Sequence, residues 1–393
     1  MKILQNNIAI LGLLFTGLVP HSHCTAQTVK ISVQNKLDFQ RTEVTSIKRE
    51  KLSRLLSKHP EKDIRIKKQG SSIYSTTQWI DYNQDGISDE LLFLADVKPN
   101  DISNYEIVID NTPIPETPIS TFSRFVPERT DDYTWENDKV AFRVYGPKGQ
   151  QEALQGIAGS TLSSGVDLWL KRVTYPIINK WYQKHLESPG YYHTDHGEGY
   201  DPYHVGNSRG TGGIGIWVND SLQVSQNYTT YKTIATGPLR TVFELTYEPW
   251  SDYGIQQTST LSLDLGSNFT RFDISLTASK KAPNYTIGIS LHQNKGETKI
   301  NTTKGWFRHW ETIDDSFIGE GIVTDPSSVT TAFANNSKTP DQSNLLVITK
   351  PSKKLVYYAG FAWQKSGQIS SKEDWDKMLE RESLIVRSPM KIK

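Results

Sequence analysis

Short runs of alternating apolar and polar residues, rich in β-branched and aromatic side chains, limit the possible folds of this chain more than any other feature. The alternation has the two-residue period of a strand that buries one face. The clearest runs lie at 28–33, 72–80, 139–145, 240–247, 258–265 and 354–363. Helices are predicted at 48–58 and 371–380, and Ser371 is placed to cap the second, with acidic residues in its first turn. The sequence therefore predicts a mostly β protein.

The chain has 393 residues, more than one small core needs. We expect either a large antiparallel β-sandwich or two stacked β units, preceded by a small β domain. The segment 111–118 carries three prolines after a run of predicted strands and marks the boundary. We therefore predict a small β domain over 27–112 and a catalytic β-sandwich domain over 113–393.

Residues 1–26 have the pattern of a cleaved signal peptide. Lys2 precedes an apolar stretch at 8–19 that is too short to span a membrane, and small residues lead to Ala26. The residues before Cys24 match a lipoprotein signal poorly, and no later segment is predicted to span a membrane. We expect an exported protein located in a bacterial periplasm. Cys24 is the only cysteine, so the mature chain would contain no thiol and no disulfide.

Charge and glycine patterns argue against several functional classes. With 44 basic and 43 acidic residues, the net charge of +1 offers no excess to hold a nucleic acid backbone. The glycines at 206–215 lead into a strand-like segment, whereas nucleotide-binding glycine loops lead into a helix. No GxSxG motif is present, and the mature chain has no cysteine nucleophile.

An acidic loop in the small domain resembles loops that wrap calcium. Oxygen ligands fall at its positions 1, 3, 5 and 9, a glycine stands at position 6, and a backbone carbonyl is available at position 7. These ligands are Asp81, Asn83, Asp85 and Asp89, with the carbonyl of Ile87. Position 12 is Leu92, where a helix–loop–helix site needs a glutamate. We predict a structural Ca²⁺ loop between two strands, with a solvated polar turn as the alternative.

The stretch 188–217 concentrates the groups that carry chemistry. Four of the nine histidines lie between His185 and His204, interleaved with acids and tyrosines. Histidine and tyrosine move protons when neighbours assist them, so acid–base catalysis fits best. Zinc binding by His193, His196 and His204 with nearby carboxylates stays open, although no HExxH motif is present. Whether a catalytic metal binds is therefore unresolved by the sequence.

Four basic residues are available to neutralise an anionic substrate: Arg143, Lys171, Arg172 and Arg209. Arginine suits this role because its planar fork meets a carboxylate with two hydrogen bonds. Arg143 and Arg172 could instead form structural ion pairs with an acid such as Asp138 or Asp167.

Four blocks of the sequence resemble one bacterial family. They are WENDKVAFRVYGP (135–147), SGVDLWLKRVTYPIINKWY (164–182), YYHTDHGEGYDPYHVGNSRGTGGIGIW (191–217) and YYAGFAWQKSGQISSKEDW (357–375). The family was long catalogued only as a domain of unknown function. Its members accompany polysaccharide lyases and unsaturated uronyl hydrolases in polysaccharide-utilisation systems, and one member from ulvan breakdown is an oligosaccharide dehydratase.

This resemblance implies a large antiparallel β-sandwich of the mutarotase-like or lyase-like super-sandwich type, preceded by a small β domain. It also implies elimination of water from a uronic acid at the non-reducing end of an anionic oligosaccharide. A base removes the C5 proton and the 4-hydroxyl leaves, which gives a 4,5-unsaturated uronyl end. His193 is then the expected base, Tyr203 or Tyr192 the acid, and Arg209 and Arg143 the cations for the carboxylate. Further expected substrate contacts are His196, His204, Lys171, Arg172, His309 and Trp135.

Three alternatives remain at this stage. A chain-cleaving polysaccharide lyase performs the same β-elimination but expels a sugar. A C5 epimerase uses the same groups and returns the proton on the other face. A non-catalytic glycan-binding protein would expose aromatic side chains without a proton-transfer cluster, which the composition of 188–217 disfavours.

Overall fold

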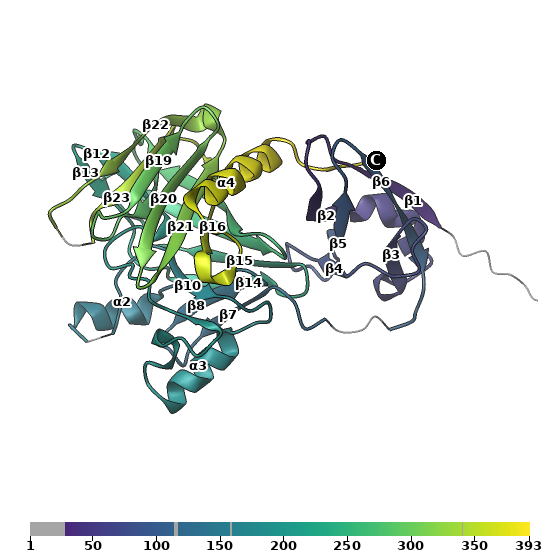
Figure 1. The fold of residues 1–393 in the computed structure, drawn as a ribbon, viewed down its shortest axis with the longest axis horizontal. Helices are drawn as coiled ribbons and strands as arrows, with labels where there is room; N and C mark the ends of the chain where they lie inside the picture. The colour runs from purple at the N-terminus through teal and green to yellow at the C-terminus, as the bar shows by residue number, and fades with distance from the viewer. Residues whose placement is uncertain (1–27, 114–116, 158, 340) are drawn as a thin grey trace, which may run out of the picture.

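The computed structural model describes residues 28–113, 117–157, 159–339 and 341–393, which form a small β body beside a larger one (Figure 1). The predicted signal peptide, 1–26, lies outside the described residues.

The helices are η1 Arg49–Leu52, α1 Ser53–Leu56, η2 Glu61–Asp63, α2 Pro147–Leu154, α3 Ile178–Glu187, η3 Tyr191–His193, η4 Pro326–Ser328, η5 Gln364–Ser366 and α4 Lys372–Arg387, where η marks a 3-10 helix. The strands are β1 Val29–Gln34, β2 Arg41–Lys48, β3 Ile64–Lys68, β4 Thr77–Ile80, β5 Glu90–Val97, β6 Ile102–Ile109, β7 Phe122–Val126, β8 Asp132–Glu136, β9 Ala141–Val144, β10 Asp167–Lys171, β11 Gly199–Tyr200, β12 Thr211–Val218, β13 Ser221–Gln223, β14 Thr230–Ala235, β15 Arg240–Thr246, β16 Ile255–Asp264, β17 Phe269–Ala278, β18 Tyr285–Ser290, β19 Glu297–Asn301, β20 Trp306–Ile313, β21 Ser316–Thr324, β22 Val329–Asn335, β23 Asn344–Thr349, β24 Lys354–Trp363 and β25 Lys391–Ile392.

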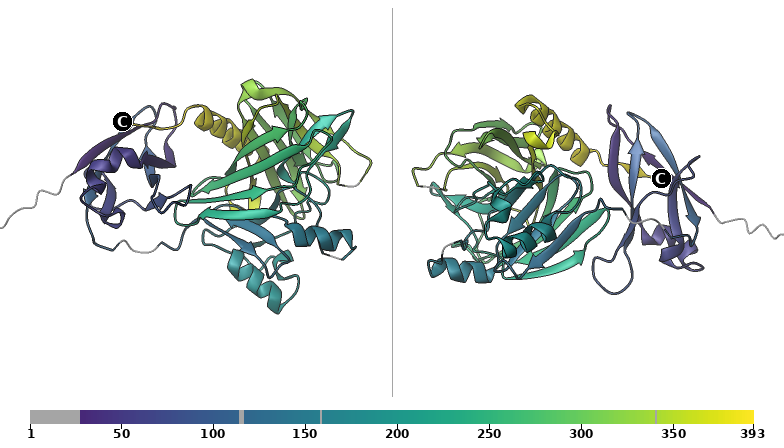
Figure 2. Two further views of the ribbon diagram at one scale, coloured as in Figure 1. Left: turned by 180° about the vertical axis from the view of Figure 1, so that it is seen from behind. Right: turned by 60° about the horizontal axis from the view of Figure 1, so that its bottom comes forward.

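The small body consists of two sheets, ordered β25-β1-β6-β3 and β2-β5-β4. Apolar side chains from both sheets and from α1 fill its core. The last strand of the chain, β25, pairs antiparallel with β1, so that Val33 lies opposite Ile392. The C-terminus therefore returns to the small body (Figure 2), and the range 113–393 does not lie wholly in the sandwich. Without β25, one edge of β1 would have unpaired backbone N–H and C=O groups, and β25 satisfies them.

The large body is an antiparallel β-sandwich, as predicted. Its eight-stranded sheet has the order β14-β15-β16-β17-β24-β21-β20-β19, and it faces a five-stranded sheet ordered β13-β12-β18-β23-β22. A continuous apolar core joins the inner faces of the two sheets. The predicted strand at 354–363 matches β24, and those at 240–247 and 258–265 correspond to β15 and β16.

Helix α4 covers the outer face of the eight-stranded sheet (Figure 1). Ser371 caps it as predicted, since its hydroxyl accepts a hydrogen bond from the backbone of Asp374. The helix continues to Arg387 because Trp375 and Leu379, one turn apart, are both buried against the sheet. A Cβ atom at Gly319 would lie 2.5 Å from the Trp375 ring, so a glycine at this position of the sheet leaves room for the indole.

A third sheet, ordered β11-β10-β9-β8-β7, carries helix α3. The sequence did not predict this helix, which lacks a capping side chain of its own. The cap comes from strand β8 instead: the carboxylate of Glu136 accepts hydrogen bonds of 2.9 Å from the backbone N–H groups of Ile177 and Ile178. A cap supplied 41 residues away in the chain leaves no local signal.

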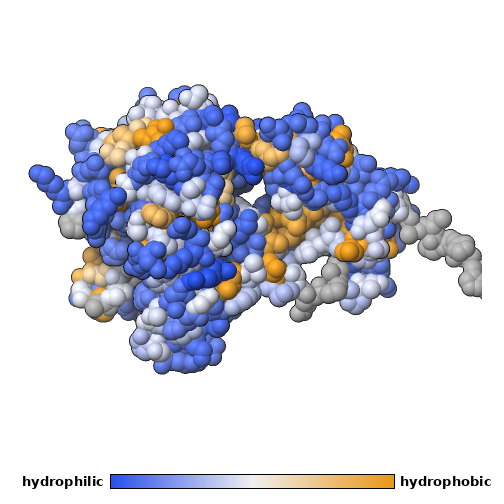
Figure 3. Space-filling view, in the orientation of Figure 1, coloured by the Kyte–Doolittle hydropathy of each residue, from blue (hydrophilic) through white to orange (hydrophobic). Residues whose placement is uncertain are grey.

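The two bodies meet at a polar contact and at an open cleft. The Gln78 side chain accepts hydrogen bonds from the backbone N–H groups of Leu239 and Arg240 and donates one to the Arg240 carbonyl. Beside this contact a cleft of about 700 Å³ separates the bodies, and Figure 3 shows apolar surface gathered around this hollow.

Glu382 of α4, half-buried at this cleft, predicts a pH-dependent stability. Burial and the nearby charge of Glu43 raise its pKa to about 8. Because the folded-state pKa is raised, the stabilisation from the neutral carboxyl is full below about pH 4.5 and is lost as pH rises through 8. Relative to wild type, Glu382→Gln should leave Tm unchanged near pH 5 and raise it by at least about 2 °C at pH 9. The exposed Glu373 is the control, and equal effects of Glu382→Gln at both pH values would contradict the prediction.

Candidate functional site

The segment that follows α3 folds back on itself and places His193 at the surface. Helix η3 carries Tyr191–His193, and the backbone N–H of Asp201 donates to the Tyr192 carbonyl at 2.7 Å. Strand β11 then joins the third sheet, with Tyr200 opposite Leu170. This return brings His193 beside Asp201, eight residues further along the chain.

Beneath His193 lies a buried group of charges, the arginine cluster, formed by Arg143, Asp132, Asp167 and Asp201. The Arg143 guanidinium binds Asp167 at 2.5 and 2.8 Å and Asp201 at 3.0 Å, and lies 3.7 Å from Asp132. Burial raises the pKa of Asp132 to about 6 and raises the pKa of Asp201 well above its usual range. The Arg143 cation thus faces three buried carboxyl groups, and proton uptake by Asp132 and Asp201 relieves their mutual repulsion.

The His193 imidazole is positioned as a base. Its side chain is 54% exposed, and Nδ1 lies 2.9 Å from the Asp201 carbonyl oxygen and 3.7 Å from the Asp201 carboxylate. A carbonyl oxygen only accepts, so Nδ1–H must donate. In the neutral ring the lone pair therefore sits on Nε2, the tautomer that a general base requires.

The His185 imidazole and the Arg129 guanidinium both contact the side chain of Tyr192, next to His193. Tyr192 is 1% exposed, stacked between Trp169 and His185, and His193 contacts its ring at 4.6 Å between centroids. Arg129 donates from Nε to the Tyr192 hydroxyl at 3.2 Å. His185 Nδ1 accepts from the backbone N–H of Gly190 at 3.0 Å, which leaves the proton of the neutral ring on Nε2. Burial and the Arg129 charge lower the pKa of His185 and favour this neutral form.

We call the group of His185, His193, Arg129 and the buried Tyr192 the His193 face. Among the described residues, the His193 lone pair and the His185 Nε2–H have no hydrogen-bond partner. The Arg129 guanidinium lies beside them and also donates from Nη2 to the Gly159 carbonyl at 2.8 Å. These are the components of proton abstraction next to a carboxylate.

A second polar group, the histidine–glutamate cluster, lies between the two large sheets. Glu320 accepts hydrogen bonds from the Tyr203 hydroxyl at 2.5 Å and the Thr211 hydroxyl at 2.7 Å, and its other oxygen lies 3.0 Å from His309 Nδ1. The neighbouring pair is His292 and Glu311, 2.7 Å apart. Burial lowers the pKa of His292, but the hydrogen bond and charge of Glu311 outweigh it and raise that pKa to about 9.

The structure places several predicted substrate contacts in the interior. Arg143 is enclosed by the arginine cluster, and its predicted alternative, an ion pair with Asp167, is what the structure shows. Arg209 is buried in the sandwich on Ser164 and the Ile214 carbonyl, away from the His193 face. Both positions contradict the predicted role of these arginines at a substrate carboxylate.

Lys171, Trp135, Tyr203 and His309 are also buried. The Lys171 ammonium binds Glu136 at 2.8 Å, in the group that caps α3. The Trp135 indole donates to Thr270 inside the core. Their partners are provided by the fold, so these side chains are not surface contacts. The Tyr203 hydroxyl is held by Glu320 and Thr211.

His196, His204 and Arg172 are on the surface, each with a separate partner. The His196 ring stacks on Tyr191 at 4.0 Å, His204 pairs with Asp341 at 3.1 Å, and Arg172 pairs with Asp195. His193, His196 and His204 therefore do not converge on one zinc ion. Across the described ranges, the one group of three His, Cys, Asp or Glu side chains with ligand atoms within 4.8 Å of each other is His309, Glu311 and Glu320.

Sequence reasoning missed Arg129 and His185 in the His193 face, and His292 and Glu320 in the other cluster. His185 carried a weak signal, since it opens the run of histidines before His204. Arg129 carried none, because it lies 63 residues before Tyr192 and reaches it only through the third sheet.

The acidic loop lies between β4 and β5, the setting predicted for it. The Asp81 carboxylate accepts 2.7 Å hydrogen bonds from the backbone N–H groups of Gln84 and Gly86, and Asp85 accepts from Ile87 at 2.9 Å. Gly86 has φ 88°, which glycine adopts without strain. The backbone thus curls around the first carboxylate, and the donor set of carboxylates, amide and carbonyl suits a hard cation.

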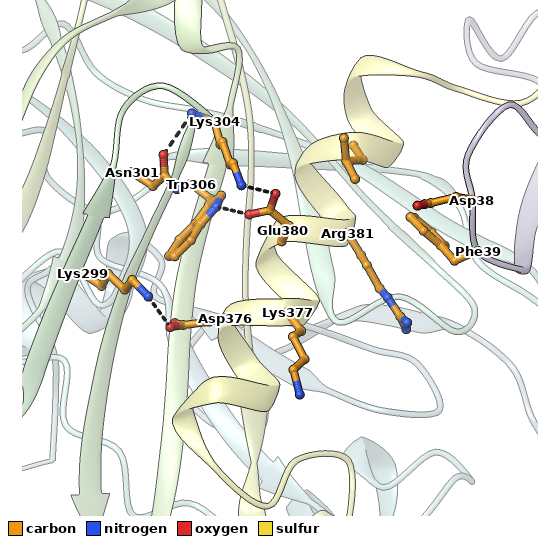
Figure 4. Close-up of a pocket in the computed structure, with 11 residues that line it drawn as sticks. Asp38, Phe39, Lys299, Asn301, Lys304, Trp306, Asp376, Lys377, Glu380 and Arg381 are labelled. Atoms are coloured by element: carbon orange, nitrogen blue, oxygen red, sulfur yellow. Dashed lines mark hydrogen bonds and ion pairs between the residues drawn. The ribbon is translucent and has the colours of Figure 1, made fainter.

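A separate cavity of about 560 Å³ lies between α4 and the strands β19 and β20 (Figure 4). Two of its cations are paired, since Lys299 binds Asp376 at 2.7 Å and Lys304 binds Glu380 at 2.5 Å. It holds none of the predicted site residues.

No helix within the described ranges is long and apolar enough to cross a membrane.

Comparisons with known proteins place the chain in a family. A family model described as "Domain of unknown function (DUF4861)" matches residues 33–392. The "Uncharacterized protein P7" of Formosa agariphila is 41% identical over 368 residues, which are 92% of each chain. Two solved structures from Enterococcus faecalis, an alpha-mannosidase and a protein of glycosyl hydrolase family 38, match with a TM-score of 0.48 and 9% identity. These matches cover 93% of this chain but 46% and 47% of theirs, so the chain spans about half their length. The family match over nearly the whole described chain, together with this relative, shows that the protein belongs to the DUF4861 family.

Proposed function

We propose that the protein is a carbohydrate-active dehydratase whose His193 face eliminates water from the uronic acid at the non-reducing end of an oligosaccharide of the ulvan type. The observation that carries the proposal is the pair of imidazoles, His193 and His185, held in opposite tautomers against Tyr192 beside Arg129. The family resemblance supports the choice of reaction.

The chemistry of this elimination matches the three groups. The C5 proton is only weakly acidic, and negative charge builds on the carboxylate as it leaves. Arg129 is the cation for that charge, worth about 3–4 kcal/mol if it acts like an oxyanion-hole donor. His193 Nε2 takes the C5 proton, the C4–C5 double bond forms and the C4–O bond breaks.

The departing 4-hydroxyl then needs a proton. His193, protonated in the first step, supplies it, while His185 Nε2–H donates a hydrogen bond that stabilises charge on the leaving oxygen. The products are water and the 4,5-unsaturated uronyl end, and His193 returns to its starting form.

Incubation of the purified protein with uronic-acid-ended oligosaccharides tests this proposal. We expect the absorbance of the unsaturated uronate to rise while the product mass falls by one water. A rise accompanied by chain shortening would identify a polysaccharide lyase instead. No rise with any uronide would contradict elimination and favour an epimerase or a glycan-binding protein.

We also propose export to the periplasm after cleavage of residues 1–26. The mass of the protein recovered from the periplasm of a bacterial host should correspond to a chain that begins at Gln27. A full-length protein retained in the cytoplasm would contradict this.

We further propose that the acidic loop binds a structural Ca²⁺ ion. At free calcium 100-fold above Kd, binding should stabilise the fold by about 2.7 kcal/mol. Chelation should therefore lower the Tm of the wild type and leave the isosteric Asp85→Asn variant, which has lost a ligand charge, nearly unchanged. An unaltered wild-type melting curve, with no calcium found by elemental analysis, would reject the site.

A further inference from the structure

The histidine–glutamate cluster has a buried polar atom without a partner. His309 is 1% exposed, and its Nε2 has no hydrogen-bond partner among the described residues. A buried ring nitrogen without a partner costs about 1–3 kcal/mol, so its retention needs a reason. This nitrogen lies against Gly296, where a Cβ atom would come within 2.1 Å of it, whereas Nδ1 faces the Glu320 carboxylate at 3.0 Å. The imidazole therefore serves the cluster through Nδ1, which can bind a metal ion once the ion replaces its proton.

Two carboxylates converge on this imidazole from the same sheet face. Glu311 lies two residues along β20 from His309, and Glu320 lies directly opposite His309 on β21. Side chains two apart in a strand, and those directly across a strand pair, point to the same face. One ligand atom from each of the three residues falls within 4.8 Å of the others.

Neighbouring side chains hold one oxygen of each carboxylate. The Tyr203 and Thr211 hydroxyls donate to Glu320 Oε1, and His292 holds Glu311 Oε1. The second ring nitrogen of His292 donates to the His204 carbonyl at 2.8 Å. Such supporting hydrogen bonds orient ligands around metal ions in proteins.

We propose that His309, Glu311 and Glu320 bind a divalent transition-metal ion, with Zn²⁺ as the first candidate. One imidazole nitrogen and two carboxylate oxygens without sulfur suit zinc and its neighbours. In tetrahedral zinc sites ligand atoms lie about 3.4 Å apart, so side chains within 4.8 Å need only small rotations to close on the ion. The cation would also offset the charge of two carboxylates inside the sandwich.

This site is distinct from the His193 face, and the inference does not depend on the proposed function. The two are linked through one short segment, since Asp201 belongs to the arginine cluster and Tyr203 supports Glu320. We infer that the bound ion anchors this segment between the sheets.

Metal analysis of the purified full chain tests the proposal without using activity. After chelation and reloading with Zn²⁺, followed by removal of free ion, we expect about one zinc per wild-type chain and a Tm above that of the metal-free protein. Glu311→Gln keeps the shape of the side chain and removes its charge, so it should lose most of the zinc. His196→Gln and His204→Gln, which change surface histidines outside the cluster, should retain it.

Cobalt substitution keeps the test decisive if the Glu311 variant folds poorly. Co²⁺ bound to the wild type through nitrogen and oxygen should give visible absorption bands that excess Zn²⁺ removes. A wild type that retains neither ion and shows no shift in Tm would overturn the proposal, as would a folded Glu311→Gln variant with full zinc content. A calcium ion in the acidic loop does not affect the zinc count. Asp85→Asn changes a ligand of that loop only, so it should leave the zinc content unchanged.

Discussion

Replacing His193 by glutamine is expected to lower the rate of uronate dehydration by about 10²- to 10⁴-fold, the usual loss when a general base is removed. Glutamine can still donate to the Asp201 carbonyl, so the loop geometry is preserved, but its amide cannot take a proton from C5. The effect should appear in kcat, because the base acts in the transition state, with a smaller change in KM. Initial rates of unsaturated product formation provide the measurement.

His196→Gln is the matched control for this variant. His196 lies in the same loop, and its ring stacks on Tyr191 away from the Asp201 carbonyl. We expect it to retain activity within a few-fold of the wild type. Full activity in the His193 variant would remove His193 from the mechanism, and equal losses in both variants would point to loop disruption instead.

Replacing Arg143 by methionine should have the largest effect on stability. It leaves Asp132, Asp167 and Asp201 buried without their cation, and breaking a buried ion pair in this way costs about 3–5 kcal/mol. Denaturant unfolding of the wild type and the variant at neutral pH measures the difference. The deficit should shrink toward pH 5, because burial already raises the pKa of Asp132 to about 6 and protonation removes the uncompensated charge.

Arg124→Met is the control for Arg143. Arg124 pairs with Glu128 at the surface, where the two side chains are 25% and 26% exposed, and such pairs contribute at most about 1 kcal/mol. Equal losses in the two variants would contradict the importance of burial. A stable Arg143→Met protein would show that the aspartates bind protons readily enough to replace the cation.

Local pattern predicted much of the fold. The alternation at 354–363 has the same bounds as β24, and Ser371 caps α4 as its position suggested. Helix α3 escaped prediction because Glu136 of β8 caps it across the sheet. The return of β25 to β1 likewise depends on an edge strand that lies far away in the sequence.

For the candidate site, residue composition predicted the segment and the type of chemistry. The density of histidine, tyrosine and acid at 188–217 marked His193, and the β periodicity determined the sandwich. The partners of these side chains depend on tertiary contacts. The fold buried Arg143 and Arg209, brought Arg129 and His185 to Tyr192, and placed His309 with Glu320 between the sheets. Residue type and local period set what a side chain can do and which face it occupies. The pairing of distant strands sets which side chains meet and whether water reaches them.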